Sequence, residues 1–109
     1  MLGISTCWWF KRAARGDEIV SDILELGLTV VELEYRISNA VFQQMKSRLK
    51  KGLTVLSIHN FFPIPEGISR EKAGGDLFLL SSTDRDKRSK AVKYSIKTIE
   101  HSHELGPGL

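Results

Sequence analysis

Three short apolar runs alternate with three longer segments of helical period, and this order restricts the possible folds more than any other feature of the sequence. The runs cover residues 2–6, 29–35 and 53–58 and have the composition of buried strands. After each run comes a segment in which apolar residues recur three and four positions apart, as on one face of a helix. Strands that alternate with helices predict an α/β fold with a parallel sheet.

The ends of the predicted helices carry residues that suit a cap. Gly27 follows the first helical segment, where a left-handed backbone is favoured. Ser38 is placed to cap the second helix. Asp84 or Asp86 can begin the third helix, which ends before Gly106. This third helix is predicted to carry four apolar residues: Val92, Ile96, Ile99 and Leu105.

The amount of chain per unit suggests a barrel. Three strand–helix units in 109 residues use about as much chain per unit as a (β/α)8 barrel, which needs roughly 250 residues for eight units. We therefore expect one domain over residues 1–109, forming part of a (β/α)8 TIM barrel that is truncated after its third helix. A sheet of three parallel strands has two unpaired edges, which favours a homo-oligomer. Functional residues are expected at the carboxyl ends of the strands.

Charge and cysteine content disfavour several classes of function. The net charge of +3, from 16 Lys and Arg against 13 Asp and Glu, is too small to favour a nucleic-acid partner. The stretch "STCWWFKRAARGD" contains no glycine-rich phosphate loop. No run approaches the roughly 18 apolar residues that a membrane span requires. The single cysteine, Cys7, cannot form an internal disulfide and has no identifiable activating base, so a packed thiol in the cytoplasm is expected.

Two glutamates share one face of the second predicted strand. Side chains alternate along a strand, so Glu32 and Glu34 lie opposite to Val31, Leu33 and Tyr35. If the apolar set faces the helices, both carboxylates face the interior or the mouth of the sheet. There a carboxylate can hold a cation, orient a sugar hydroxyl or accept a proton. In the alternative, Glu34 is solvated at the strand end and Glu32 pairs with a cationic side chain.

The stretch "LSIHNFFPIP" places a histidine at the carboxyl end of the third strand. Alternation puts Val55, Ser57 and His59 on one face, with His59 last. Its imidazole can bind a divalent metal or donate a hydrogen bond to a substrate oxygen, and a structural histidine is the alternative. Phe61 and Phe62 are expected to form an apolar wall for the carbon face of a sugar, or else to plug the top of the barrel.

Two tryptophans directly follow the first strand. Exposed, Trp8 and Trp9 would leave much apolar surface in water, so we expect them to pack in the core or to form a wall beside a sugar. A stacking platform for nucleic-acid bases, with Lys11, Arg12 and Arg15 to meet phosphates, is the alternative.

Four segments resemble the N-terminal part of the xylose isomerase-like TIM barrels, the sugar phosphate isomerase/epimerase group that is related to the family 2 AP (apurinic) endonucleases. They are "LGIST", "VELEYR", "TVLSIHNFFPIP" and "LFLLSSTDRDKRSKAVKYSIKTIEHSHELG". The resemblance extends over essentially the whole chain and corresponds to the first three of eight barrel units.

The resemblance implies an enzyme that isomerises or epimerises a sugar or polyol derivative with a divalent metal, Mn²⁺, Mg²⁺, Co²⁺ or Zn²⁺. The family's glutamate on the second strand corresponds to Glu32. Its histidine after the third strand corresponds to His59, which contacts substrate in the isomerases and binds zinc in the endonucleases. The principal metal ligands of the isomerases are expected on later strands, outside this sequence. The predicted substrate site contains six residues: Glu32, His59, Trp8, Trp9, Phe61 and Phe62.

Besides substrate binding, the resemblance makes His59 a candidate metal ligand. Two other functions stay open at this point. One is a non-catalytic α/β fragment that associates through its open sheet edges, and the other is an AP endonuclease-like DNA-repair protein.

Overall fold

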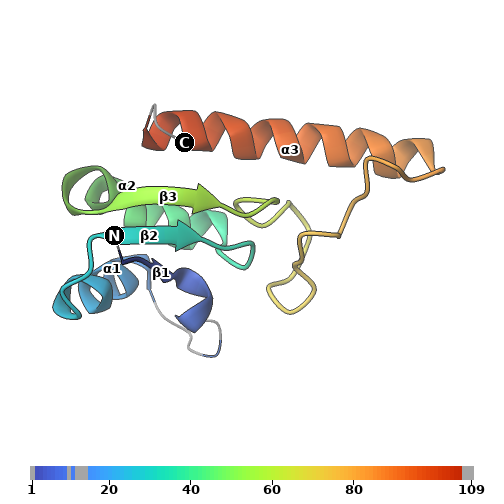
Figure 1. Cartoon of the computed structure of the whole chain (residues 1–109). Coiled ribbons are helices and arrows are strands. Elements are labelled where there is room, and N and C mark those ends of the chain that lie inside the picture. Colours follow the sequence, from blue (N-terminus) through green and yellow to red (C-terminus); the bar gives the residue numbers. More distant parts are fainter. Residues whose placement is uncertain (1, 10, 12–14, 107–109) are drawn as a thin grey trace.

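Three parallel strands and three α-helices make up the fold in the computed structural model, which describes residues 2–9, 11 and 15–106. The elements in chain order are β1 (Ile4–Ser5), the 3₁₀-helix η1 (Thr6–Trp9), α1 (Gly16–Glu25), β2 (Val30–Leu33), α2 (Asn39–Gly52), β3 (Thr54–Ile58) and α3 (Arg85–Leu105). The strands form one sheet in the order β1-β2-β3, and both pairings are parallel (Figure 1). The predicted α/β fold with a parallel sheet is confirmed.

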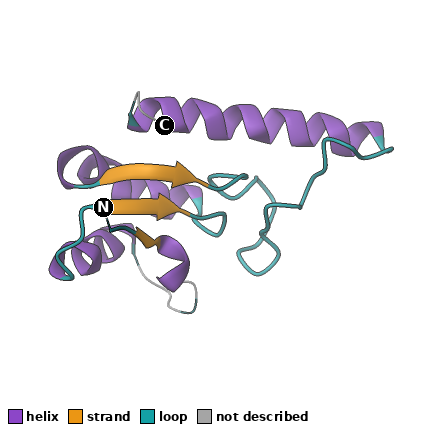
Figure 2. Ribbon diagram, in the orientation of Figure 1, coloured by secondary structure: helices purple, strands orange, loops and turns teal. Residues whose placement is uncertain are grey.

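The core lies between the sheet and the two helices α1 and α2, which run behind the strands in Figure 2. Each helix contributes one apolar face and β2 contributes the side chains that point toward the helices. The central residues are Ile19, Val20, Ile23, Val31, Leu33, Phe42, Met45 and Leu49, all of them buried. Burial of a side chain of this size stabilises the fold by about 1.5–3 kcal/mol.

The predicted helix ends agree with the structure. Gly27, with φ of 76°, adopts the left-handed conformation expected after α1. The Ser38 hydroxyl accepts a hydrogen bond from the Val41 N–H at the start of α2. Asp84 caps α3 by accepting from two backbone N–H groups, of which the nearer is that of Asp86 at 2.9 Å. These caps satisfy N–H groups that have no partner within a helix.

The third helix packs differently from the first two. α3 lies beside β3 in Figure 1, and its buried residues are Ala91 and Thr98. Of the four apolar residues that predict this helix, Leu105 packs against the core, but Val92, Ile96 and Ile99 are 48%, 50% and 65% exposed. At about 100° per residue they form a separate stripe, roughly a third of a turn around α3 from Ala91 and Thr98. Neither α3 nor any other helix in the described part of the chain is long and apolar enough to cross a membrane.

Polar contacts attach the loop after β3 to α3. The Phe62 N–H donates to Thr98 Oγ1 at 2.9 Å, and the Thr98 hydroxyl lies 3.0 Å from Asn60 Oδ1. The Asn60 amide in turn donates to Ser95 Oγ at 2.9 Å. The Asn60–Phe61 and Phe62–Pro63 peptide bonds are cis. The hydrogen bonds to Thr98 and Ser95 fix the path of the chain just beyond His59, and the bond to Thr98 satisfies the buried N–H of Phe62.

Candidate functional site

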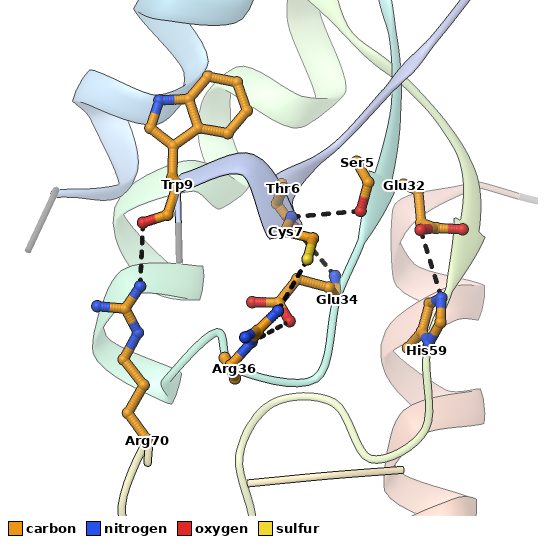
Figure 3. Close-up of polar contacts among 9 residues, drawn as sticks. All are labelled: Ser5, Thr6, Cys7, Trp9, Glu32, Glu34, Arg36, His59 and Arg70. Atoms are coloured by element: carbon orange, nitrogen blue, oxygen red, sulfur yellow. Dashed lines mark hydrogen bonds and ion pairs between the residues drawn. The ribbon is translucent and has the colours of Figure 1, made fainter. Parts of the chain in front are cut away.

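Glu32 and His59 meet at the carboxyl ends of two adjacent parallel strands. Glu32 belongs to β2, and His59 follows the last residue of β3. The His59 backbone N–H donates to the Leu33 carbonyl at 2.8 Å, which extends the hydrogen-bond ladder between the two strands to residue 59. His59 Nε2 then lies 3.3 Å from Glu32 Oε1 (Figure 3). The structure thus brings together the two residues that the sequence placed at one rim of the sheet.

A bulge in β3 adds a serine to this pair. Val31 is opposite Val55, but Glu32 is opposite Ser57, so Leu56 is an extra residue in the strand. Ser57 donates a hydrogen bond to Glu32 Oε2 at 2.8 Å. Val55 packs against the core instead of sharing the face of Ser57. The predicted alternation is therefore wrong at Val55, because the bulge shifts the phase of the strand.

The environment of Glu32 favours its charged form. The hydrogen bond from Ser57 is the main cause that holds the pKa of Glu32 below its ordinary value of 4.5. Partial burial opposes this change, and further interactions with Ser5 and His59 support it. The side chains of Glu32 and His59 are 36% and 48% exposed, so a ligand can reach both. A carboxylate acceptor and an imidazole therefore lie side by side at an accessible strand end.

The second glutamate of β2 has a different role. Glu34 is buried, and its carboxylate receives a hydrogen bond from Arg36 Nε at 2.8 Å. Burial is the largest single influence and lowers the pKa of Arg36, but the hydrogen bond and charge of Glu34, together with Cys7 and Tyr35, offset it, so the pKa of the guanidinium is raised. The alternative, in which Glu34 is solvated and Glu32 pairs with an Arg or Lys, is wrong, because Glu34 is buried and the arginine pairs with Glu34. Cys7 is exposed, contrary to the expected packed thiol, and its sulfur accepts from Arg36 Nη2 at 2.8 Å.

The two tryptophans lie away from the Glu32–His59 pair. Trp9 is buried, and its indole N–H donates to Asp22 Oδ2 of α1 at 2.9 Å. Figure 3 shows Trp9 and His59 on opposite sides of the view. Trp8 is 66% exposed. The structure therefore does not combine Trp8 and Trp9 with Glu32 and His59 in one site.

Three basic residues, Lys11, Arg12 and Arg15, were expected near the tryptophans as contacts for phosphates. Lys11 is exposed, and Arg15 forms an ion pair with Asp17 at 3.1 Å at the start of α1. Arg12 lies outside the described residues.

Phe61 and Phe62 are core residues in the structure, with 2% and 1% of their surface exposed. The Phe62 ring packs edge-on against Phe42 with centroids 4.9 Å apart, and the Phe61 ring lies 5.5 Å from Phe78. Side chains this deeply buried offer almost no surface to a ligand. Both rings are therefore packed in the core and do not form an exposed wall, and Glu32, Ser57 and His59 remain as the accessible group.

The hydroxyl groups of Ser5 and Ser57 were not predicted as site residues. The position of Ser57 in the sequence could have indicated its role, because it is a polar residue inside an otherwise apolar strand and lies two positions before His59. Nothing in the short first strand distinguishes Ser5, because its proximity to Glu32 follows from the pairing of β1 with β2. Polar residues at this edge are thus contributed by all three strands.

The described residues do not form a complete site for the divalent metal that the resemblance implies. Glu32 and His59 offer two donor atoms, and no group of three or more His, Cys, Asp or Glu residues within the described ranges is arranged to hold an ion. A catalytic metal usually has three protein ligands. Glu32 and His59 are therefore candidates for direct contact with a substrate.

Comparisons of the chain with protein family models, with curated proteins and with solved structures found no match.

Proposed function

We propose that Glu32 and His59 are the substrate side of a sugar phosphate isomerase or epimerase of the xylose isomerase-like group. The observation that supports this most is the 3.3 Å contact between the carboxylate and the imidazole at the ends of adjacent parallel strands. The proposal takes the three strands as the first three of a (β/α)8 barrel, which fits their sequential order and the position of α1 and α2 on one face. We place the activity in the cytoplasm, where the exposed Cys7 would stay reduced.

The proposed chemistry needs one base and one hydrogen-bond donor. Isomerisation moves a proton between neighbouring carbons. A base removes it beside a carbonyl and the carbonyl oxygen gains a proton; the resulting enediol is then protonated at the other carbon while its second hydroxyl loses a proton and becomes the new carbonyl. Glu32, charged and held by Ser57, can remove and return the proton. His59 can donate to the carbonyl oxygen. Every step proposed for this chain uses its own side chains and none uses a metal.

Sugar binding can be tested by titrating the protein with aldoses, ketoses and inositols, free and phosphorylated, while the histidine signals are followed by NMR. We expect saturable shifts of the His59 imidazole and none of His103, which is exposed on α3. Glu32→Gln should weaken binding about 10- to 150-fold, because a hydrogen bond to a charged group contributes about 1.5–3 kcal/mol. His103→Asn is the matched control for His59→Asn and should bind as the wild type does.

The same titration has a defined pH dependence. Because the pKa of Glu32 is lowered, its carboxylate form should persist below pH 4.5 and binding should be lost only as the pH falls through the lowered value. Ser57→Ala removes the main cause of the lowering, so this loss should move to higher pH. Unchanged affinity in Glu32→Gln would contradict the proposal.

Exchange of the substrate C–H with deuterium from solvent then separates a catalyst from a binding module.

A second candidate function, association of two copies of the chain, is favoured by the outer surface of α3 and β3. Val92, Ile96 and Ile99 form an exposed apolar stripe on α3, and Leu56 of β3 is 61% exposed. Within the described residues β3 pairs with β2 alone, so its outer edge has no strand partner. An unpaired strand edge beside an apolar helix face is a surface that a second copy could cover around a two-fold axis.

Sedimentation over a range of concentrations tests this association. We expect a dimer for the wild type and a monomer for Ile96→Asp, because the interface would then bury an unpaired charge. Lys90→Ala changes the net charge by the same amount outside the apolar stripe and should still dimerise. A wild type that stays monomeric at all concentrations would rule the association out.

A further inference from the structure

Both tryptophans of the sequence line a hollow that the proposed sugar site does not use. It has a volume of about 410 Å³, and its described lining residues are Trp8, Trp9, Asp22, Glu25 and Leu26. It lies beside α1, away from Glu32 and His59. We name it the tryptophan pocket. Pockets of roughly 300–1,000 Å³ hold small organic molecules.

Of the two tryptophan rings in the tryptophan pocket, that of Trp9 is fixed in position. Trp9 is 3% exposed, and its N–H donates to Asp22, so its ring cannot turn freely. The Trp8 ring stands at 77° to that of Trp9 with centroids 5.1 Å apart. Trp8 is itself 66% exposed. The buried Trp9 ring therefore supports the Trp8 ring from behind, and the exposed indole of Trp8 is the aromatic surface on which a ligand group can rest.

Both charged side chains among the described lining residues of the tryptophan pocket are acidic. Asp22 and Glu25 are three residues apart on α1, so their side chains project from the same side of the helix. They belong to the carboxyl-terminal half of α1, whose last turn contains no basic residue. The carboxyl end of a helix carries partial negative charge and favours cations. Two carboxylates there create a local excess of negative charge that a bound cation would relieve.

The exposed Trp8 indole and the two carboxylates together select an organic cation. Tryptophan is the aromatic side chain that attracts cations most strongly, and cages of this type bind quaternary ammonium groups. A sugar could also stack on an indole, but it would not neutralise Asp22 and Glu25. From the geometry and the charge we infer that the tryptophan pocket binds an alkylammonium group, carried either by a free small molecule or by a methylated lysine side chain.

Tryptophan fluorescence tests this inference directly, because the sequence has no tryptophan outside the pocket. We expect choline to produce a saturable change, and 3,3-dimethyl-1-butanol, its neutral isostere, to bind about 2- to 30-fold more weakly, as expected for loss of a cation–π contact. Acetyl-trimethyllysine amide carries the same head group on a peptide. Tighter binding of this probe would identify a protein side chain as the source, and tighter binding of choline a free molecule.

Variants identify the binding residues by calorimetry. Trp8→Leu and Glu25→Gln change exposed side chains, so both should remain folded and both should bind choline several-fold more weakly. Glu100→Gln removes an exposed carboxylate from α3 and should bind as the wild type does. Equal binding of choline and its neutral isostere, preferential binding of a sugar, or no binding of choline at millimolar concentration would each overturn the inference.

Discussion

Replacement of Phe62 by alanine is expected to lower the free energy of unfolding by about 3–5 kcal/mol, the usual cost of deleting a buried phenylalanine. Phe62 is 1% exposed, and its ring packs against Phe42 and His101. The substitution keeps the backbone N–H that donates to Thr98, so the loss comes from the missing ring and the cavity that it leaves. Denaturation by urea, with an unchanged slope, measures the difference.

Phe78→Ala is the matched control for this experiment. Phe78 stacks on Tyr94 with centroids 5.6 Å apart but is only partly buried, so its removal should cost clearly less. If Phe62 formed an open wall for a ligand, both substitutions would have small effects on stability and Phe62→Ala would mainly weaken ligand binding. That outcome would contradict the placement of Phe62 in the core.

The local order of the chain could be predicted from its sequence because short-range signals determine it. The β-branched residues of 29–35 and the caps at Ser38 and Asp84 act within a few residues of themselves. The Glu32–His59 contact could be anticipated as well, since parallel neighbouring strands end at one edge of a sheet. These features need no knowledge of how the helices pack.

Features that depend on packing between distant segments could not be predicted in this way. The bulge at Leu56 changes the face of Val55, yet no glycine or proline marks it in the strand. Alternation likewise predicted that Glu34 shares a face with Glu32, but it could not predict that Glu34 would be buried and paired with Arg36. The tryptophans lie beside Asp22 because η1 turns the chain toward α1 after only two residues of β1.

Gly16 is the clearest case of a residue whose role depends on packing that the sequence does not reveal. Gly16→Ala is expected to destabilise the protein by about 1–3 kcal/mol or more through overpacking. Gly16 is the first residue of α1, and a Cβ there would collide with the Val41 carbonyl oxygen and lie 2.6 Å from Met45 Cγ of α2. Its N–H also donates to the Gln44 side chain at 2.8 Å. The backbone oxygen cannot move aside, so the two helices must separate and lose contacts in the core.

Gly52→Ala, in the same pair of helices, is expected to have the opposite effect on stability. Gly52 ends α2, and a Cβ there would lie 3.9 Å from the methyl carbons of Leu24 on α1, an ordinary contact. Alanine at such a position restricts the unfolded chain and should stabilise the protein by about 0.4–1 kcal/mol. Thermal and urea unfolding of both variants therefore compare one added methyl group at two places along the α1–α2 interface. If Gly16→Ala also stabilised the protein, the close approach of the helices at that point would be refuted.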